Sequence, residues 1–505
     1  MNTGDLLQFD AIPLQTQPNG PLVVELIPAP NPWTIARHLA YLPHLLFLDS
    51  AEQHPTRGRY SYVMADPQET LIRRVQEPQN PLFNIQFPIQ SLTRPNDLPP
   101  FIGGWAGLFG YGLVRAFERI RPPQNDEFAV PDLALGRYDW VISFDHLTNR
   151  SWLVSCGVKL DYETPSDRLQ RAKQQVGAIL KLLRSPRTPI SPLVPTPELQ
   201  PSELFYAQHP LPDFPYVTSN FSRLGYEAAV QRVVDYIHAG DCFQVNLSQR
   251  LLAPLNEPPL ELYGRLRQLN PAPFAGYFDL GEYQILSASP ERFLRLNSDG
   301  GIETRPIKGT RPRGCTPEDD ARFRHDLVTS TKDRAENVMI VDLLRNDVGK
   351  VSAYGSVRVP RICEVETFQF VHHLVSEIRA QLRPGLGPLD LLAAAFPGGS
   401  VTGAPKVRAM EIIADLEPTA RGPYCGCLGW MGYDGAMDTN ILIRTFTAGR
   451  GWVQFPVGGG IVAESEPARE YEETLHKAAG LLRALDITHH DPHLSHGHRM
   501  VSNPI

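Results

Sequence analysis

The chain has 505 residues, of which 42% are hydrophobic and 20% charged, and at about 150 residues per domain its length allows roughly three domains. This composition is typical of a folded globular protein and argues against a largely disordered one. The net charge of −7 is too small to favour a protein that binds nucleic acid through a basic surface, so we expect no nucleic-acid partner. Six cysteines without CxxC spacing argue against a disulfide scaffold or a structural zinc site.

Neither a membrane span nor a signal peptide is predicted. No window approaches the roughly 18 consecutive apolar residues of a membrane helix. The first ten residues, MNTGDLLQFD, lack the basic start and the apolar core of a signal peptide. We therefore expect a cytoplasmic protein with no membrane partner.

Residues 1–185 predict an N-terminal part made of short strands and turns with a few helices. The strand-like segments are residues 45–50, 59–65, 137–146 and 151–160, and the last two predict a hairpin. The helical periodicity of residues 166–184 predicts a helix with Ser166 as its N-cap.

Proline marks the boundary between two parts of the chain. Nine of the 48 prolines fall within residues 186–215, a density that favours extended chain and cannot hold a helix or a central strand. We therefore predict a connector over residues 186–217, between the N-terminal part and a C-terminal catalytic part over residues 218–486. Residues 487–505 form a His-rich tail that we expect to be a frayed terminus.

The C-terminal part combines clustered strands with long helices. Strands are predicted at residues 242–251, 284–296 and 451–462, and helices at residues 226–238, 318–345, 405–415 and 467–485. The strands are not strictly interleaved with the helices. This arrangement favours the α+β class over a doubly wound α/β sheet.

Two of these helices each carry an acidic pair at i, i+3. Asp333 and Glu336 share one helical face, and so do Glu470 and Glu473. Two such faces brought together would form the oxygen-rich site that Mg²⁺ prefers. Acidic pairs also occur on ordinary solvated helix faces, and the spacing alone leaves that alternative open.

Two glycine-rich segments are candidate binding loops. Residues 397–410, PGGSVTGAPKVRAM, enter a helix at Pro405, an N1 residue, and free amides there can hold an anion. The GK[ST] ending of a P-loop is absent, which argues against ATP and leaves a carboxylate-binding loop or a plain tight turn. Residues 457–462, VGGGIV, are a second cluster that is equally consistent with a bulge.

Lys308 and Glu291 are candidates for covalent and acid catalysis. Lys308 lies in RPIKGTRPRG, and a desolvated lysine there would have a lowered pKa and act as a nucleophile. The alternative is an exposed, inert lysine. Glu291 ends a predicted strand and would be a general acid if buried; the alternative is an ion pair with Arg292 or Arg295.

Taken together, these segments resemble the chorismate-utilising enzymes, the family of anthranilate, aminodeoxychorismate, isochorismate and salicylate synthases. The matching stretches include SPERF, PIKGTRPRG, AENVMIVDLLRNDVG, HHLVSEI, FPGGSVTGAPKVRAM, MDTNILIRT, GGGIVAESEPAREYEET and GDCFQVNLSQR, in family order from about residue 20 to 485. The resemblance implies an α+β layered sandwich of large, mostly antiparallel sheets flanked by helices, with two intertwined subdomains as in anthranilate synthase component I. It also implies a Mg²⁺-dependent reaction on chorismate.

The resemblance also implies roles for single residues. Glu336 and Glu473 would be the magnesium ligands, with Asp333 and Glu470 beside them. The residues that would line the chorismate site are Gly309, Thr310, His373, Thr402, Gly403, Tyr424, Arg444, Gly458, Gly459 and Gly460. The planar fork of Arg444 suits the enolpyruvyl carboxylate, and His373 would lie near the reacting ring.

Within the family, the motif PIKGT resembles the aminodeoxychorismate synthases, because anthranilate synthases typically read PIAGT. Isochorismate-type members place a lysine base where this chain has Gln244, which disfavours activation of water at C2. No segment resembles a glutamine amidotransferase, so we expect that a separate amidotransferase subunit supplies ammonia.

The resemblance implies a two-step amination of chorismate. Neutral Lys308 would attack C2 while Glu291 protonates the departing C4 hydroxyl, and ammonia would then add at C4 and expel the lysine. The product would be 4-amino-4-deoxychorismate. Two alternatives remain: anthranilate synthesis with release of pyruvate, and a catalytically silent subunit that binds tryptophan or activates an amidotransferase.

A candidate tryptophan site lies outside these motifs. Its residues resemble the segments that bind tryptophan in relatives and are Ser50, Arg59, Tyr60, Pro273 and Phe274. In anthranilate synthases such a site inhibits, whereas in the other branch the bound tryptophan is structural. Ordinary core packing is the alternative.

Overall fold

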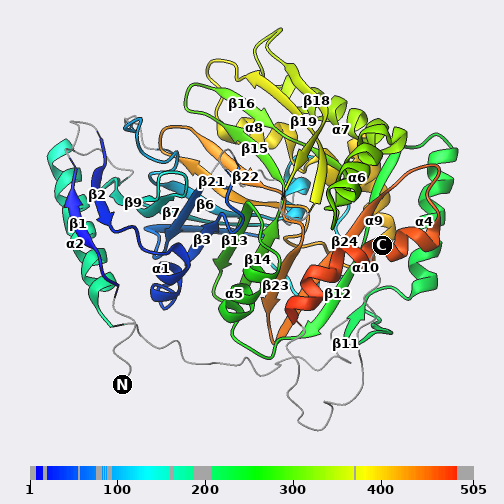
Figure 1. Cartoon of the computed structure of the whole chain (residues 1–505), viewed down its shortest axis with the longest axis horizontal. Coiled ribbons are helices and arrows are strands. Elements are labelled where there is room, and N and C mark those ends of the chain that lie inside the picture. Colours follow the sequence, from blue (N-terminus) through cyan, green and yellow to red (C-terminus); the bar gives the residue numbers. More distant parts are fainter. Residues whose placement is uncertain are drawn as a thin grey trace.

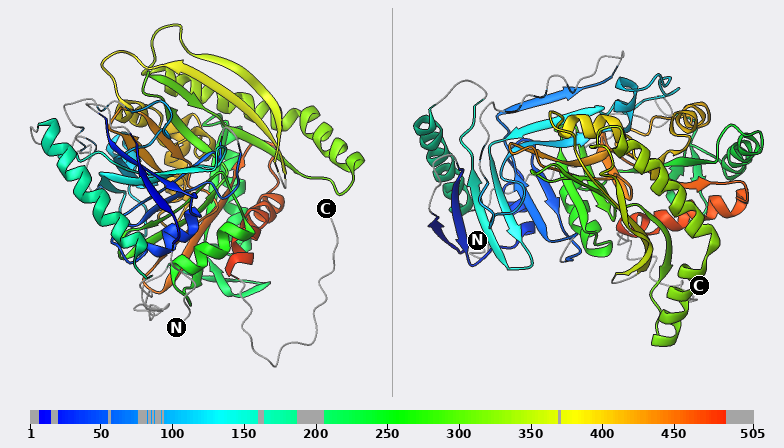
Figure 2. Two further views of the ribbon diagram at one scale, coloured as in Figure 1. Left: turned by 60° about the vertical axis from the view of Figure 1, so that its left-hand side comes forward. Right: turned by 90° about the horizontal axis from the view of Figure 1, so that it is seen from above.

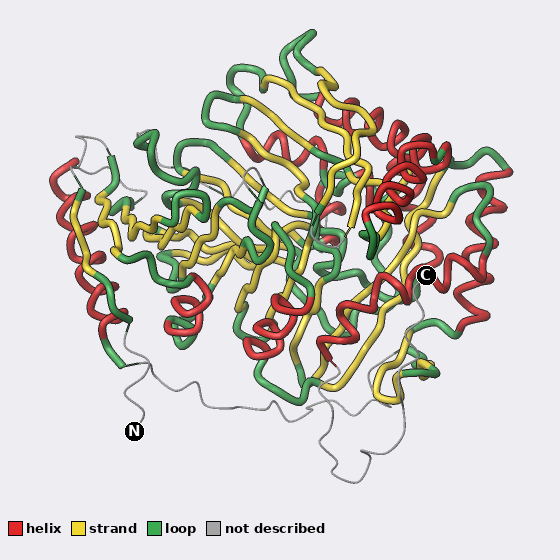
Figure 3. Tube along the Cα trace, in the orientation of Figure 1, coloured by secondary structure: helices red, strands yellow, loops and turns green. Residues whose placement is uncertain are grey.

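The computed structural model describes residues 7–14, 20–54, 57–75, 82, 85, 87, 92, 94–159, 164–186, 206–368 and 371–485. Most of the predicted connector and the whole His-rich tail lie outside these residues. The described end of the connector is strand at His209–Leu211 and from Phe214 onward, so the expectation of extended chain without a paired strand is wrong there. Two large antiparallel sheets form the centre of the molecule, and helices cover their outer faces (Figures 1 and 3).

The first sheet has 14 strands, in the order β1-β2-β9-β8-β4-β3-β13-β14-β23-β24-β12-β11-β10, with β20 paired to β12. Its strands are β1 (Asp10–Pro13), β2 (Leu22–Ile27), β3 (Leu46–Asp49), β4 (Tyr60–Met64), β8 (Trp140–Asp145), β9 (Arg150–Ser155), β10 (His209–Leu211), β11 (Phe214–Ser219), β12 (Gln244–Pro254), β13 (Phe274–Asp279), β14 (Tyr283–Ser289), β20 (Gly403–Ala404), β23 (Thr445–Gly449) and β24 (Trp452–Ile461). The predicted hairpin is present as β8 and β9.

The second sheet has ten strands, in the order β17-β19-β16-β15-β22-β21-β6-β7-β5, with β18 paired to β19. Its strands are β5 (Glu69–Arg73), β6 (Gly104–Phe109), β7 (Leu133–Tyr138), β15 (Arg292–Leu296), β16 (Gly301–Thr304), β17 (Ile307–Pro312), β18 (Arg358–Thr367), β19 (Val371–Gln381), β21 (Cys427–Gly432) and β22 (Met437–Asn440). The sheets share a core, where Tyr62 of β4 meets Trp430 of β21 with ring centroids 6.3 Å apart.

Both sheets combine strands from before and after the connector. In the first sheet β3 pairs with β13, and in the second β6 pairs with β21. The prediction of an α+β sandwich with intertwined subdomains is therefore confirmed. The residue boundaries given above for those parts stay predictions.

Nine α-helices and two short 3-10 helices are present among the described residues. They are α1 (Pro32–His38), η2 (Tyr111–Ala116), α2 (Pro165–Arg184), α4 (Arg223–His238), α5 (Pro259–Leu269), α6 (Pro317–Thr329), α7 (Thr331–Gly349), α8 (Pro388–Ala395), η3 (Gly399–Val401), α9 (Lys406–Leu416) and α10 (Pro467–Leu485). Helices α5 and α10 pack on the first sheet and α7 on the second (Figure 1). Within the described part of the chain, no helix combines the length and the apolar character that crossing a membrane requires.

Three helix boundaries differ from the predictions. The helix expected over residues 318–345 is two helices, because the Ser330 hydroxyl accepts a hydrogen bond from the Asp333 amide and starts α7 anew. Thr164, not Ser166, caps α2, since Pro165 occupies the N1 position. Pro405 is the N-cap of α9 and not its N1 residue.

The strand predicted over residues 284–296 is interrupted at Pro290. Proline has no amide hydrogen to donate to a sheet, and the chain leaves the first sheet after β14 and enters the second as β15. Glu291 therefore lies where the chain crosses between the sheets. The chain crosses back between β22 and β23, and the Ile441 amide of that crossing donates to the Glu291 carbonyl at 3.0 Å.

A buried ion pair joins the elements that surround these crossings. The Arg421 guanidinium donates to both carboxylate oxygens of Glu417, at 2.8 and 2.7 Å, and to the carbonyls of Val401 and Asn246. Glu417 also accepts from the amide and the hydroxyl of Ser248, each at 2.8 Å. The pair thus ties the end of α9 to η3 and β12 with its hydrogen-bonding groups satisfied.

We predict that Arg421→Ala destabilises the fold by about 3–5 kcal/mol, because it leaves the Glu417 carboxylate buried and unpaired. The midpoint of thermal or urea unfolding measures the effect. Arg469→Ala is the control, since Arg469 pairs with Glu466 at 2.9 Å while its side chain is 81% exposed. Equal midpoints for the two variants would contradict the assignment.

Candidate functional site

The candidate site lies where elements of both sheets meet under two helices. Strands β12 and β24 come from the first sheet and β17 and β19 from the second, and α7 and α10 close the remaining sides (Figure 1). The two crossings described above supply Glu291 and Arg444. Residues predicted from seven separate motifs are therefore carried by adjoining elements.

Lys308 lies in a bulge of β17. Ile307 is paired with Val375 and Thr310 with His373, so Lys308 and Gly309 together face one residue of β19. Gly309 has φ +78°, and a β-carbon on it would come within 3.0 Å of Asp333. The bulge therefore requires glycine at this position.

The Lys308 side chain is partly buried, and its amine faces β24 and β12. A β-carbon on Gly460 would lie 3.4 Å from Lys308 Nζ and 2.6 Å from Gln244 Nε2, so both side chains reach the same part of β24. Burial lowers the pKa of Lys308, and the carboxylates of Glu336, Glu291 and Glu473 only partly oppose this shift. The exposed, inert lysine considered from the sequence does not fit this environment.

Glu291 is buried and partly protonated near neutral pH. Desolvation raises the pKa of its carboxyl to about 7, although Lys308 and a 3.2 Å hydrogen bond from Ser400 favour the charged form. The alternative pairing with Arg292 is wrong, because Arg292 binds Asp438 at 2.9 and 3.1 Å and Glu303 at 3.0 Å. Glu291 can therefore donate a proton inside the site.

Gln244 is a buried amide whose polar atoms lack partners. Its side chain is fully buried, and neither its oxygen nor its nitrogen has a hydrogen-bond partner among the described residues. A buried amide left unpaired costs roughly 1–3 kcal/mol, so such groups in native proteins often face a ligand or water. Gln244 and Lys308 together mark a polar space beside Gly460.

Three of the four predicted acidic residues adjoin this space. Glu336 has its pKa raised by burial, with a further contribution from Glu473. A β-carbon on Gly459 would lie 3.2 Å from Glu470 and 3.4 Å from Glu473, which places both carboxylates against β24. Asp333 instead binds Arg311 at 2.9 Å, so its carboxylate is already neutralised.

Carboxylate oxygens such as those of Glu336, Glu470 and Glu473 are of the kind that a hard cation prefers. Burial, with a smaller contribution from the Glu473 charge, raises the pKa values of Glu336 and Glu470, whereas Lys477 holds the pKa of Glu473 below its usual range. No group of three or more histidine, cysteine, aspartate or glutamate side chains is arranged to hold a metal ion within the described ranges. A cation here would take its remaining ligands from water or a bound anion, as Mg²⁺ commonly does.

His373 and Arg444 line a cavity of about 300 Å³ that also includes Pro290. Burial, with Arg444 and Arg57, lowers the pKa of His373 to about 3, so the ring is neutral at physiological pH and bonds the Thr310 hydroxyl at 2.9 Å. Arg444 has φ +51°, a left-handed conformation that is costly for arginine, and burial lowers its pKa. A carboxylate in this cavity would relieve the desolvation of Arg444.

The glycine-rich loop over residues 397–410 is largely used in packing. The Thr402 hydroxyl donates to the Gly398 carbonyl at 3.1 Å, and a β-carbon on Gly403 would lie 2.1 Å from the Gln244 carbonyl. Lys406 binds Asp347, so it does not point into the loop as a P-loop lysine does. The tight turn is thus supported, and anion binding by this loop stays a prediction.

The last predicted substrate residues occupy supporting positions. A β-carbon on Gly458 would lie 2.4 Å from the Leu247 carbonyl, so glycine allows β24 and β12 to approach closely. Tyr424 is buried with its ring 5.7 Å from the Arg421 guanidinium. Neither Gly458 nor Tyr424 shows a contact with the polar space, so their roles in binding chorismate stay predictions.

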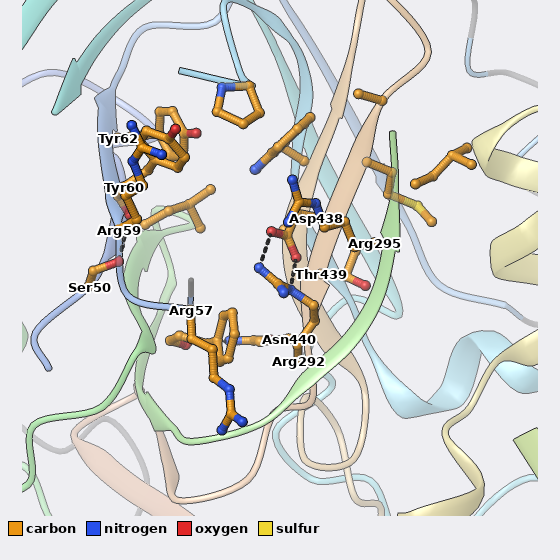
Figure 4. Close-up of a pocket in the computed structure, with 18 of the residues that line it drawn as sticks. Ser50, Arg57, Arg59, Tyr60, Tyr62, Arg292, Arg295, Asp438, Thr439 and Asn440 are labelled. Carbon is orange, nitrogen blue, oxygen red and sulfur yellow. Dashed lines mark hydrogen bonds and ion pairs between the residues drawn. The ribbon is translucent and has the colours of Figure 1, made fainter. Parts of the chain in front are cut away.

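A second cavity, of about 520 Å³, lies between the two sheets. Its walls include all five residues of the candidate tryptophan site: Ser50, Arg59, Tyr60, Pro273 and Phe274. Figure 4 shows Ser50, Arg59 and Tyr60 on one wall, with Arg292 and Asp438 on the other. These five residues therefore line a space large enough for a ligand and do not simply pack against one another as core residues.

Three residues that contact the candidate site residues were not identified from the sequence. Ser400 binds Glu291, Lys477 binds Glu473 at 2.7 Å and the Gly458 carbonyl at 3.0 Å, and Arg311 binds Asp333. Lys477 follows Glu473 at i+4, a spacing that predicts an ion pair. Nothing local signals Ser400, because its partner is 109 residues away.

Comparisons with known proteins agree with this geometry. A family model described as chorismate binding enzyme matches residues 44–483. The chain is 44% identical over 423 residues to anthranilate synthase component 1 of Thermus thermophilus, covering 84% of this chain and 83% of that protein. It is 40% identical over 469 residues to aminodeoxychorismate synthase component 1 of Escherichia coli K12, covering 89% and 94%.

A solved structure supports the fold directly. The crystal structure of anthranilate synthase component I from Streptococcus pneumoniae TIGR4 superposes with a TM-score of 0.70 at 30% identity, covering 86% of this chain and 93% of that one. The anthranilate synthase component I-like sandwich predicted from the sequence is therefore confirmed.

We predict that Lys308 reacts with acetic anhydride at a lower pH than an exposed lysine, because burial favours its neutral amine. Competitive labelling from pH 6 to 10 in EDTA, read by peptide mass spectrometry, gives the titration, with exposed Lys173 as the reference on the same chain. Coincident labelling curves for the two lysines would show that Lys308 is not desolvated.

Proposed function

The chain belongs to the chorismate-binding enzymes, and from this premise we propose that it is component I of an aminodeoxychorismate synthase. It would convert chorismate and ammonia to 4-amino-4-deoxychorismate and water. Overall identity does not choose the branch, since relatives named for both branches lie between 36% and 44%. The choice therefore depends on the site.

The observation that carries the proposal is the desolvated Lys308 beside the protonatable Glu291. The motif PIKGT resembles the aminodeoxychorismate branch, and anthranilate synthases typically have alanine at this position. Burial favours the neutral, nucleophilic amine and the protonated, acidic carboxyl at the same time. A lysine that only bound an anion would need its charged form, which burial disfavours.

In the proposed mechanism the Lys308 amine attacks C2 of chorismate, both conjugated ring double bonds shift by one position, and the C4–O bond breaks. Glu291 gives its proton to the departing hydroxyl, which leaves as water, and the carboxylate then takes the surplus proton of the lysine adduct. Ammonia adds at C4, both double bonds shift back, and the C2–N bond to Lys308 breaks as Glu291 gives its proton to the departing lysine nitrogen. The new ammonium group at C4 then returns a proton to Glu291. Two displacements thus replace one difficult substitution.

The site residues would hold chorismate by its two carboxylates. Arg444 would pair with the enolpyruvyl carboxylate in the cavity that it shares with His373. Neutral His373, fixed by Thr310, would lie beside the ring as a hydrogen-bonding group and not as an acid. Gln244, whose amide is unpaired, would bind a polar group of the substrate or the incoming ammonia.

We also propose that the site takes Mg²⁺, with Glu336 and Glu473 as its ligands and Glu470 beside them. The cation would neutralise the ring carboxylate and favour its binding. The acidic donor set and the raised pKa values of Glu336 and Glu470 support this proposal. Lys477 pairs with Glu473 and supplies a positive charge at the same place.

The proposed ammonia source is a partner subunit. The relatives are named component 1, which implies a second component, and we infer that this is a glutamine amidotransferase. The larger cavity is a proposed tryptophan site, supported by its volume and by the mixture of aromatic and charged residues in its walls. Anthranilate synthase component I remains the second candidate function, favoured by the 44% identity to one such relative.

We predict that the protein with chorismate, Mg²⁺ and ammonium yields 4-amino-4-deoxychorismate and that Lys308→Ala abolishes this synthesis. Glu291→Gln should lower kcat by about 10²–10⁴-fold, the range for loss of a general acid. Lys173→Ala is the control for loss of an amine. Products are identified by liquid chromatography with mass spectrometry. If Lys308→Ala still makes the product at the full rate, Lys308 is not the nucleophile. If the wild type makes anthranilate and pyruvate, the protein belongs to the anthranilate synthase branch.

We predict about one tryptophan per chain in protein purified under native conditions and then denatured. Mass spectrometry of the released small molecules gives the ratio. The Ser50→Phe variant, which places a ring in the cavity, should release none while retaining its chorismate activity. If the wild type releases no tryptophan and takes up none in equilibrium dialysis, the larger cavity is not a tryptophan site.

A further inference from the structure

The strand that carries Lys308 has a weakly specified register. β17 lies at the end of the strand order in its sheet and pairs with β19 alone among the described strands. Beyond the bulge only three residue pairs continue the ladder, and the last contains Pro312, which has no amide hydrogen. Edge strands with short ladders are prone to slip, and a slip of one residue turns each side chain to the opposite face.

One carboxylate joins the two strands just past the bulge. Asp320, in the first turn of α6, accepts hydrogen bonds from the Arg313 guanidinium at 2.6 and 3.1 Å and from the Gly314 amide at 2.9 Å. Both donors directly follow β17. Asp320 is also 3.0 Å from Nε2 of His372, which belongs to β19. A single side chain thus holds both strands of the ladder.

His372 is fixed on both of its ring nitrogens. Its side chain is 1% exposed, and Nδ1 lies 2.9 Å from the Thr367 hydroxyl. The Arg313 guanidinium and the Gly314 amide keep the pKa of Asp320 well below its usual range, so Asp320 is a carboxylate and accepts from Nε2–H. With the Thr367 hydroxyl at Nδ1 and Asp320 at Nε2, both ring nitrogens have a hydrogen-bond partner.

Neighbouring side chains of a strand point to opposite faces, and the two histidines of β19 follow this rule. His372 binds α6 through Asp320, whereas His373 binds Thr310 on the side of the candidate site. In the ladder, Thr310 faces His373 and Arg311 faces His372. Fixing His372 therefore fixes the pair that closes the bulge around Lys308.

Helix α6 packs on β17, β18 and β19, with Leu327 in a small apolar cluster. Leu327 is its only buried residue, and the helix projects from the body of the molecule (Figure 2, yellow-green).

We propose that Asp320 and His372 are positioning residues, which lock the register of β17 on β19 and thereby hold the Lys308 amine in place. The inference rests on the proposed function only in the role given to Lys308. A displacement of about 1 Å in a reacting group can cost about 10²-fold in rate, so loss of the lock should be visible in kcat.

The experiment compares Asp320→Ala and His372→Leu with His372→Gln, whose amide can still donate to Asp320. Glu318→Ala is the matched control, an exposed carboxylate in the same turn of α6. The full chain is assayed with chorismate, Mg²⁺ and ammonium for kcat and KM. Lys308 is labelled competitively with acetic anhydride, against Lys173, as a readout that does not depend on turnover.

We expect Asp320→Ala and His372→Leu to lower kcat by about 10–100-fold with a smaller change in KM, and to alter the labelling rate of Lys308. His372→Gln should recover most of both, and Glu318→Ala should match the wild type. If Asp320→Ala does not fold, Asp320→Asn, which loses the charge and keeps the shape, takes its place.

Unchanged kcat and labelling in both variants would overturn the proposal. The proposal would also be overturned if activity fell only in proportion to the amount of folded protein and His372→Gln did not restore it. If the wild type makes anthranilate instead, the proposed function fails, while the labelling of Lys308 still decides whether the lock exists.

Discussion

The burial of the Glu291 carboxyl, with the partial burial of Lys308 beside it, is the constraint around which this site is organised. Burial favours the neutral form of each group, which lowers the pKa of the amine and raises that of the carboxyl to about 7. Both groups are thereby brought toward the states that covalent and acid catalysis need. In water an ordinary lysine would be charged and an ordinary glutamate ionised near neutral pH.

The fold provides this environment by interleaving its two sheets. Glu291 and Arg444 lie on two adjacent crossings between the sheets, and Gln244 and the glycines of β24 come from the first sheet while Lys308 comes from a bulge in the second. The Arg421–Glu417 pair joins the end of α9 to β12 and η3 beside the crossings. All of these residues lie between Gln244 and Glu473, but separate strands, crossings and helices bring them together.

Much of the fold could be predicted because it depends on local pattern. The hairpin of β8 and β9, the helix from Pro467 to Leu485 and the α+β class all follow from periodicity and turn signals. The single helix expected over residues 318–345 was wrong because apolar periodicity continues across Ser330, where a side-chain cap restarts the helix. The state of Glu291 could not be read from sequence, since it depends on a crossing and on Ser400 109 residues away. The register lock by Asp320 and His372 also depends on contacts between distant segments.

The central claim is that Lys308 forms a covalent bond with the substrate, and trapping that bond tests it most directly. The protein is mixed with chorismate and Mg²⁺ in the absence of ammonia, and the reaction is then quenched. The quenched protein is digested with a protease, and the peptides are analysed by mass spectrometry. The account predicts that the peptide containing Lys308 gains the mass of chorismate less one water, and that the gain disappears on addition of ammonium. No adduct in the wild type, or the same adduct in Lys308→Ala, would contradict it.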